Sequence, residues 1–362
     1  MIENSDEHKS KSLIYYQEMF LIGVLPVLHL IGIMSNIICG KIFSSLDNFK
    51  TSTFKLLTAN SIVSAIFLLA ILFTPFTQCI NLCEPWLSVY FTMTIRKYIA
   101  MYVCRLLDTT STLINITIVI DQYLCIRNIR LKKRNRVIIG TVLLYVIVSA
   151  TLFSPNLFFH NIKLIIDKND TRKVTYIFEE TSFSRNNLTK TAIISIQHII
   201  SIVCIIVVII VNILLLNKLY ERLRGMNRDL TKFVMVKSAP SSAKFSMKAR
   251  GSSTKNKSCS NGTTVQPEIV MRYSKKKTVS TIEKQTTIMV VMISVIYLIN
   301  QISTQCFNTA FIFIDTKSKI VLINFSMIAY NFCAYIFHGT NIFIYYYFNG
   351  KFALELKKLF YK

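Results

Sequence analysis

Seven apolar runs, each long enough to cross a lipid bilayer, constrain the fold of this chain more than any other feature of its sequence. The hydrocarbon core of a bilayer requires about 20 apolar residues in a helix, and 52% of the 362 residues are hydrophobic. The sequence therefore predicts an all-α membrane protein with a bundle of seven transmembrane helices. The runs cover residues 19–43, 54–78, 91–125, 137–159, 191–216, 286–314 and 320–348.

The connections between these runs differ in their content of basic residues. More than two thirds of the 42 Lys and Arg residues lie in 41–55, 122–136, 217–285 and 349–362. Because basic residues at the ends of spanning helices stay on the cytoplasmic side, we expect an extracellular N-terminus over 1–18 and a cytoplasmic C-terminus. The net charge of +24 does not indicate nucleic-acid binding, since the basic residues lie between apolar runs and not within a folded domain.

Two of the expected cytoplasmic segments have distinct compositions. Residues from about 225–280 are rich in Ser, Thr, Lys and Gly and cannot bury an apolar core, so we expect a disordered loop. Its flanks, at 217–226 and 278–287, are predicted to extend the adjacent helices. Residues 349–362 have the spacing of an amphipathic helix that lies on the inner leaflet. The apolar face of that helix would comprise Phe352, Leu356, Leu359 and Phe360.

Two kinds of candidate modification site lie in the expected extracellular loops. Asn169 and Asn187 each begin an Asn-x-Thr tripeptide between the fourth and fifth runs, where glycosylation would agree with an extracellular N-terminus. The same pattern also occurs in the expected cytoplasmic loop, so it does not establish the orientation by itself. Cys79 and Cys83 flank a short polar loop and could form a local disulfide if that loop is extracellular.

Charged side chains within the third run indicate a binding site. Arg105 and Asp108 are three residues apart on one helical face, and charges at membrane depth are costly and usually functional. Arg105 could meet an anionic or amide-rich ligand, and Asp108 could meet an amine. Alternatively, the two could form a structural ion pair with each other or with another helix. Further polar candidates in the fifth and sixth runs are Gln197, His198, Gln301 and Gln305.

Short sequence words narrow the class of membrane protein. In order and spacing, these words resemble those of the rhodopsin-like (class A) G-protein-coupled receptors, and most closely those of divergent invertebrate peptide or chemosensory receptors. The resemblance covers all seven expected helices and the short helix after them. The words are Ser35-Asn36, Asp121-Gln122-Tyr123, Asn341-Ile-Phe-Ile-Tyr345, and Phe352 seven residues after that Tyr.

The resemblance implies a function and a set of roles. It implies a plasma-membrane receptor, with its receptor domain over 19–348, that transduces an extracellular peptide or small chemosensory ligand to a heterotrimeric G protein. It implies no cofactor and no enzymatic activity. Cys104 stands where aminergic receptors have an acid, which disfavours a biogenic amine. The implied activation residues are Asp121, Gln122, Tyr123, Glu283, Tyr297, Asn341 and Tyr345. The implied inner polar network is Asn36, Asn60, Ser64 and Ser111.

The chain also departs from the family's pattern at several positions. Gln122 replaces the family's Arg and has no charge, so a lock with Asp121 or Glu283 would be weaker; this predicts higher basal activity or poorer coupling. The proline of the family's seventh-helix motif is absent, which removes the expected kink. The family's acid in the second helix is replaced by Asn60 or by Ser64, depending on the alignment, so sodium binding should be weak.

Two other classes of function remain as alternatives. No phosphate-binding loop, dinucleotide fingerprint or metal-ligand cluster is present in the sequence, so an enzyme is not expected. The first alternative is a transporter or channel, which would require several intramembrane acids or internal repeats. Asp108 is the only acid deep within an apolar run. The second alternative is a receptor-like scaffold or decoy that no longer couples to a G protein, because several motif residues are replaced.

Overall fold

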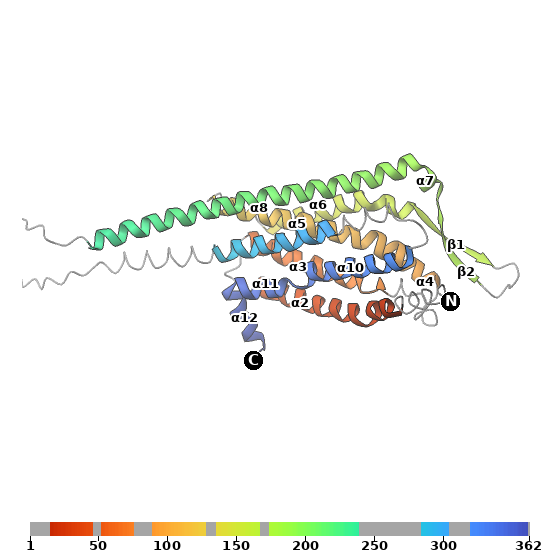
Figure 1. Ribbon diagram of the computed structural model, residues 1–362, viewed down its shortest axis with the longest axis horizontal. Coiled ribbons are helices and arrows are strands. Elements are labelled where there is room, and N and C mark those ends of the chain that lie inside the picture. The colour runs from red at the N-terminus through yellow and green to blue at the C-terminus, as the bar shows by residue number, and fades with distance from the viewer. Residues whose placement is uncertain are drawn as a thin grey trace, which may run out of the picture.

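The computed structural model describes residues 15–45, 52–75, 89–127, 135–166, 174–238, 284–303 and 319–360. The expectation of a helical membrane protein is confirmed within these residues, because six helices are long and apolar enough to cross a bilayer. A further helix, α10 (Lys319–Gly339), runs alongside them (Figure 1). The six are Tyr15–Ser45, Ser52–Ile71, Tyr90–Ile126, Arg136–Phe158, Leu188–Arg222 and Lys284–Ser303.

The third of these helices is central to the bundle. Its main part, α5 (Cys104–Ile126), packs against α3 (Ser52–Ile71), α6 (Asn135–Phe153) and α8 (Asn187–Ser238). On the other side of the bundle, α10 packs against α3 and α2 (Leu25–Ser45). α5 buries a series of Ser, Thr and Asn residues along its length, and this pattern requires polar partners on the surrounding helices.

Two of the long helices contain π-helical segments. η1 (Phe20–Val24) precedes α2, and Pro26 lies just beyond it. Because proline has no backbone N–H, it removes one donor from the α-helical ladder at this point. η4 (Ile95–Val103) connects α4 (Val89–Thr94) to α5. π-helical turns are rare and often accompany functional sites, so the segment that precedes Arg105 is unusual.

Two glycines bring α2 and α10 into close contact. A Cβ atom built on Gly32 would lie 3.1 Å from the Cα atom of Gly339 and 2.8 Å from Cδ1 of Leu68. A Cβ atom on Gly339 would in turn lie 3.3 Å from the Cα atom of Gly32, so a side chain on either glycine would crowd the backbone of the other helix. Small residues at such crossings allow helices in a membrane to gain backbone packing.

The helix formed by the last of the predicted runs is interrupted in spite of its missing proline. α10 ends at Gly339 and α11 (Asn341–Phe348) begins two residues later, with Thr340 between them. The Thr340 hydroxyl donates to the Ile336 carbonyl at 2.5 Å, and the Phe343 N–H donates to the Thr340 carbonyl. The expectation that the helix would lose its irregularity is therefore wrong, because glycine and a back-bonding threonine interrupt it without proline.

One end of the bundle carries a β-hairpin that the sequence patterns did not predict. After η5 (Ser154–Phe158), strand β1 (His160–Ile166) pairs antiparallel with β2 (Val174–Glu180). A short helix, α7 (Ser182–Arg185), connects the hairpin to α8. This hairpin end also contains the start of the first helix, in red, whereas α12 lies at the opposite end (Figure 1).

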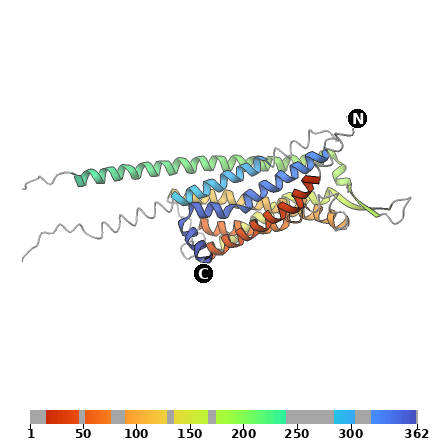
Figure 2. The same cartoon turned by 60° about the horizontal axis from the view of Figure 1, so that its bottom comes forward.

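At the α12 end, two elements extend from the bundle. α8 continues to Ser238 and projects well beyond the other helices in both views (Figure 2). The predicted helical extension at 217–226 is confirmed, and it is longer than expected, since the loop was placed from about residue 225. Residues 239–283 lie outside the described part of the chain.

The short helix α12 (Gly350–Phe360) is where the sequence placed an amphipathic helix. Asn349 ends α11 in an extended conformation and its Oδ1 atom accepts a hydrogen bond from the Phe352 N–H at 3.1 Å. Phe352 is fully buried, against Phe43 and Tyr345 at ring-centroid distances of 5.2 and 5.4 Å. Phe360 is 67% exposed. One end of the apolar face therefore attaches the helix to the bundle and the other end remains available for lipid.

Candidate functional site

A buried polar cluster joins four helices about midway along the bundle. Asp108 is near the middle of the helix Tyr90–Ile126 and is 8% exposed. Its Oδ2 atom accepts a hydrogen bond from Gln301 Nε2 at 3.4 Å, and its Oδ1 atom lies 3.5 Å from His338 Nε2. The other ring nitrogen of His338, Nδ1, lies 3.0 Å from the Ser64 hydroxyl. Asp108, Gln301, His338 and Ser64 are referred to below as the Asp108 cluster.

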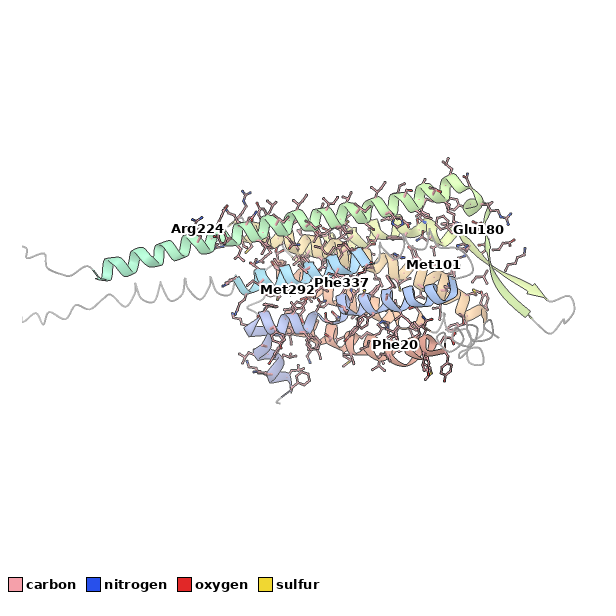
Figure 3. All side chains as sticks on the ribbon, in the orientation of Figure 1. Phe20, Met101, Glu180, Arg224, Met292 and Phe337 are labelled. Carbon is pink, nitrogen blue, oxygen red and sulfur yellow. The ribbon has the colours of Figure 1, made fainter. Side chains whose placement is uncertain are left out.

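His338 is held in place by both its ring and its backbone. The ring lies 4.2 Å from the ring of Phe67 and 4.4 Å from that of Phe337, measured between centroids. The His338 carbonyl accepts a hydrogen bond from Asn36 Nδ2 at 2.5 Å. Phe337 lies between Met101 at the hairpin end and Met292 toward the α12 end (Figure 3). His338 is also directly before Gly339, so the cluster lies next to the interruption of the seventh helix.

Arg105 has a different environment from Asp108, although the two are neighbours on one helix. Its guanidinium lies over the ring of Tyr330 in α10, at 5.7 Å from the centroid. Within the described residues no ion pair joins Arg105 to Asp108. Asp108 approaches a titratable group on another helix, His338, and this contact is an ion pair only when the imidazole is protonated. Cys104, the preceding residue, is buried and is a free thiol.

The fifth-helix candidates differ in what they contact. Gln197 donates from Nε2 to the Asn156 Oδ1 atom at 3.2 Å and to the Leu152 carbonyl at 3.3 Å. These contacts join α8 to the end of α6, so Gln197 has a role in helix packing. His198 is half-buried in α8. The structure does not bring either residue into the Asp108 cluster.

One ion pair connects the hairpin to the start of α8, and another joins the two strands of the hairpin. Lys190 Nζ lies 2.6 Å from Glu180, and Lys163 Nζ lies 3.1 Å from Glu179. The hydrogen bond and the charge of Lys190 lower the pKa of Glu180 below its usual value. The group is exposed and the pair is present at neutral pH; it is lost in acid, as Glu180 takes up a proton.

A second group of polar contacts lies toward the α12 end of the bundle. Gln122 donates from Nε2 to the Thr287 hydroxyl at 3.0 Å, which links α5 to the helix Lys284–Ser303. Asp121 accepts a hydrogen bond from the Thr53 hydroxyl at 2.7 Å, which links α5 to α3. Tyr123 lies under the guanidinium of Arg127. The contact at residue 122 is therefore neutral, where the family's Arg would carry a charge.

The expected inner network is only partly continuous. Ser111 donates its hydroxyl proton to Asn60 Oδ1 at 2.8 Å, whereas Ser64 belongs to the Asp108 cluster one helical turn away. Asn341 and Tyr345 are buried in α11, and the Tyr345 ring packs edge-on against Phe43 at 4.8 Å. Tyr297 is buried against Phe337 at 5.4 Å. Neither amide atom of Asn115 has a hydrogen-bond partner among the described residues.

Some candidates lie outside the described residues, and others were missed from the sequence. Asn187 begins α8, but only its backbone is described. His338, Thr287 and Lys97 were not among the candidates. A polar residue next to Gly339 was the available signal for His338, and Thr287 had no signal beyond its type. The candidates outside the described residues are Cys79, Cys83, Asn169, Glu283 and Gln305.

The described residues contain no group of three His, Cys, Asp or Glu side chains placed to hold a metal ion. No protein-family model matches the chain, and no curated protein matches it. The Asp108 cluster and the Gln122–Thr287 contact are therefore the strongest structural indications of function.

Proposed function

We propose that this chain is a seven-helix receptor of the rhodopsin-like type, which transduces an extracellular ligand to a heterotrimeric G protein at the plasma membrane. The single observation that carries this proposal is a pair of polar contacts between α5 and the helix Lys284–Ser303 at two depths. Gln301 meets Asp108 midway along the bundle, and Thr287 meets Gln122 near the α12 end. The sequence words of the family and the distribution of basic residues also support it.

The arrangement suggests how a signal would pass through the bundle. A ligand at the hairpin end would act on Arg105 and on the Asp108 cluster, which joins α5 to α3, α10 and the helix Lys284–Ser303. A shift of that last helix away from α5 would break the Gln122–Thr287 hydrogen bond and open a cytoplasmic cleft. Packed bundles of this kind change between discrete arrangements, and a ligand selects the arrangement that it binds better.

The proposal is tested by the basal signalling of variants in cells. Thr287→Val removes the acceptor of Gln122 and should raise basal dissociation of at least one G protein above that of the wild type. Gln122→Arg restores the family's charge and should lower basal signalling, because it strengthens the inactive contact through Asp121 or Glu283. G-protein dissociation is measured by energy transfer between tagged subunits, at equal surface expression.

Thr141→Val is the matched control. The Thr141 side chain is half-buried on α6, and its hydroxyl bonds to the Val137 carbonyl of its own helix at 2.8 Å, so its loss should not alter signalling. The wild type and all three variants are also tested with ligand panels of peptides, amines and lipids. If none of them gives more signal than untransfected cells, coupling to G proteins is overturned.

The neutral contact of Gln122 favours a second candidate, a receptor-like protein that has lost coupling and acts as a scaffold or decoy. Arg at this position carries a permanent charge and a fork of donors that Gln does not have. In that case the wild type is silent to every ligand, while Gln122→Arg gains a response. A response of the wild-type chain to any ligand excludes this candidate.

A further inference from the structure

Among the described residues, the acids at the hairpin end already have contacts, and Glu18, buried at the start of the first helix, is not free either. Glu179 and Glu180 are both in ion pairs, with Lys163 and Lys190. Deeper in the bundle, the two carboxylate oxygens of Asp108 face Gln301 and His338. Glu179, Glu180 and Asp108 therefore have contacts other than Lys97 and Arg105, the two cations nearby, although Asp108 Oδ1, 3.5 Å from His338 Nε2, makes no hydrogen bond within the described chain.

Lys97 and Arg105 meet aromatic rings instead of acids. Lys97 is only 8% exposed, and its ammonium lies 5.2 Å from the centroid of the Tyr98 ring. The Arg105 guanidinium lies 5.7 Å from the Tyr330 centroid. Within the described part of the chain, neither cation has an ion pair. The face of an aromatic ring compensates only part of the hydration free energy that a buried cation loses. An added anion would therefore stabilise both cations.

Several cations at this end of the bundle act on the same histidine. His160, at the start of β1, has a pKa below its usual value, mainly because it is partly buried and next because Lys190 is close. The charges of Lys97 and Arg96 also lower this pKa, while Glu180 opposes the shift. Lys97 is therefore close enough to the base of the hairpin to act electrostatically on the same space as Lys190.

These observations decide between the two ligand classes that the sequence left open. An amine that bound Asp108 would have to enter beside Gln301 and His338, which lie 3.4 and 3.5 Å from its two carboxylate oxygens. A carboxylate could bind Arg105 while Tyr330 remains stacked on the guanidinium, because the donors of that group lie in its plane and match both oxygens of a carboxylate. Lys97 would add attraction at longer range.

We propose that the hairpin end of the bundle binds a ligand through a carboxylate group, with Arg105 as the direct contact and Lys97 as the supporting charge. This inference rests on the proposed receptor function in that it specifies the ligand of the same site. The carboxylate can belong to a small organic acid or to the C-terminus of a peptide.

The experiment measures the thermal unfolding of the purified full-length protein in detergent. The probes are a series of linear carboxylic acids from acetate to octanoate, a tetrapeptide library with free C-terminal carboxylates, and the same library with amidated C-termini. A carboxylate probe at ten times its dissociation constant should raise the Tm of the wild type by about 2 °C. A response to the acids or to the peptides identifies the source of the carboxylate.

Variants separate the site from general effects of anions. Arg105→Gln and Lys97→Gln should each lose most of the response, Arg105→Lys should keep part of it, and Lys163→Gln should keep it all, since Lys163 is exposed and paired with Glu179. Without probe, Arg105→Gln and Lys97→Gln should unfold at the wild-type temperature or above it, because an unpaired charge has been removed.

Three outcomes overturn the inference. The first is a wild type whose Tm no carboxylate probe raises. The second is an equal response in Arg105→Gln or to the amidated library. The third is an Arg105→Gln or Lys97→Gln variant that unfolds earlier without probe or fails to fold, because the cation would then be paired within the fold. The assay involves no G protein, so a chain that binds carboxylates without signalling would contradict the proposed coupling and leave this inference intact.

Discussion

At the scale of single residues, Asp108 has the most demanding environment in the described chain. A carboxylate in the middle of a membrane bundle is stabilised only by partners that lie across helix boundaries. Here the partners are Gln301 and His338, and the His338 ring is in turn fixed by Ser64 and by the ring of Phe67. One substitution therefore affects the packing of four helices.

Asp108→Ala should lower the free energy of unfolding by about 1–3 kcal/mol, because the buried Gln301 Nε2 group would lose its acceptor. Asp108→Asn keeps the shape of the side chain and one acceptor oxygen, so it should lower the free energy of unfolding by less. Tm values of the purified protein in detergent provide the measurement. Thr110→Val is the control, since the buried Thr110 hydroxyl bonds only to the Leu106 carbonyl of its own helix. Equal Tm losses for Asp108→Ala and Thr110→Val would mean that the cluster does not join the helices.

At the scale of elements, the packing of the bundle depends on the crossings where two helices approach each other most closely. The crossing of α2 and α10 has backbone in direct contact at Gly32 and Gly339. The hydrogen bonds of Asn36 to the Gly32 and His338 carbonyls lie at the same crossing. The close approach therefore also sets the position of His338, and through it the geometry of the Asp108 cluster.

Gly32→Ala should destabilise the protein by about 1–3 kcal/mol, the usual cost of overpacking. The added methyl group would lie 3.1 Å from the backbone of Gly339, which cannot move without the whole of α10. Gly140→Ala is the matched control, because a Cβ atom there meets nothing within 4 Å. Thermal unfolding of the two variants in the same detergent is compared. An unchanged Tm for Gly32→Ala would show that α10 can move away at little cost.

The attachment of α12 can be tested in the same way. Phe352→Ala should lower the free energy of unfolding by about 3–5 kcal/mol, because it removes a fully buried ring that contacts Phe43 and Tyr345. Phe360→Ala changes the same residue type on the same helix at an exposed position and should leave the Tm in detergent unchanged. Similar losses for both variants would indicate that α12 unfolds independently of the bundle.

At the scale of the whole molecule, the hairpin and α12 lie at opposite ends of the bundle (Figures 1 and 2). The basic residues of the sequence are concentrated toward the α12 end, in α12 itself and in the connections that the orientation rule places in the cytoplasm. From that rule we expect the hairpin and the Arg105 region to be extracellular and the Gln122–Thr287 contact to be cytoplasmic.

An epitope tag before Met1 should stain intact cells, and a tag after Lys362 should stain only after permeabilisation. Asn256 begins an Asn-x-Ser tripeptide in the expected cytoplasmic loop and serves as the control. Asn169→Gln should reduce the shift in gel mobility that glycosidase treatment of the wild type produces, whereas Asn256→Gln should leave that shift unchanged. An N-terminal tag that becomes visible only on permeabilisation would reverse the orientation and place Arg105 on the cytoplasmic side.

Local patterns in the sequence predicted most of the elements. The apolar runs correspond to the helices because a bilayer imposes a length on each span, and the basic tract after Gln122 marks one end of α5 in the expected place. The extension of α8 and the amphipathic helix after α11 were also predicted. The β1–β2 hairpin was not, since its strands are short and their stability depends on pairing with each other.

The sequence by itself determined the membrane character of this protein, the approximate position of its spans and the residues with unusual polarity, because these depend on neighbours within a single helix. The tertiary structure decided which polar residues meet. The runs are apolar on nearly all sides, so their patterns do not define how each helix is rotated. The pairing of Asp108 with His338, 230 positions later in the chain, and the stacking of Arg105 on Tyr330 follow from that rotation. For the same physical reason, the sequence left open whether Arg105 and Asp108 would meet a ligand or form an ion pair.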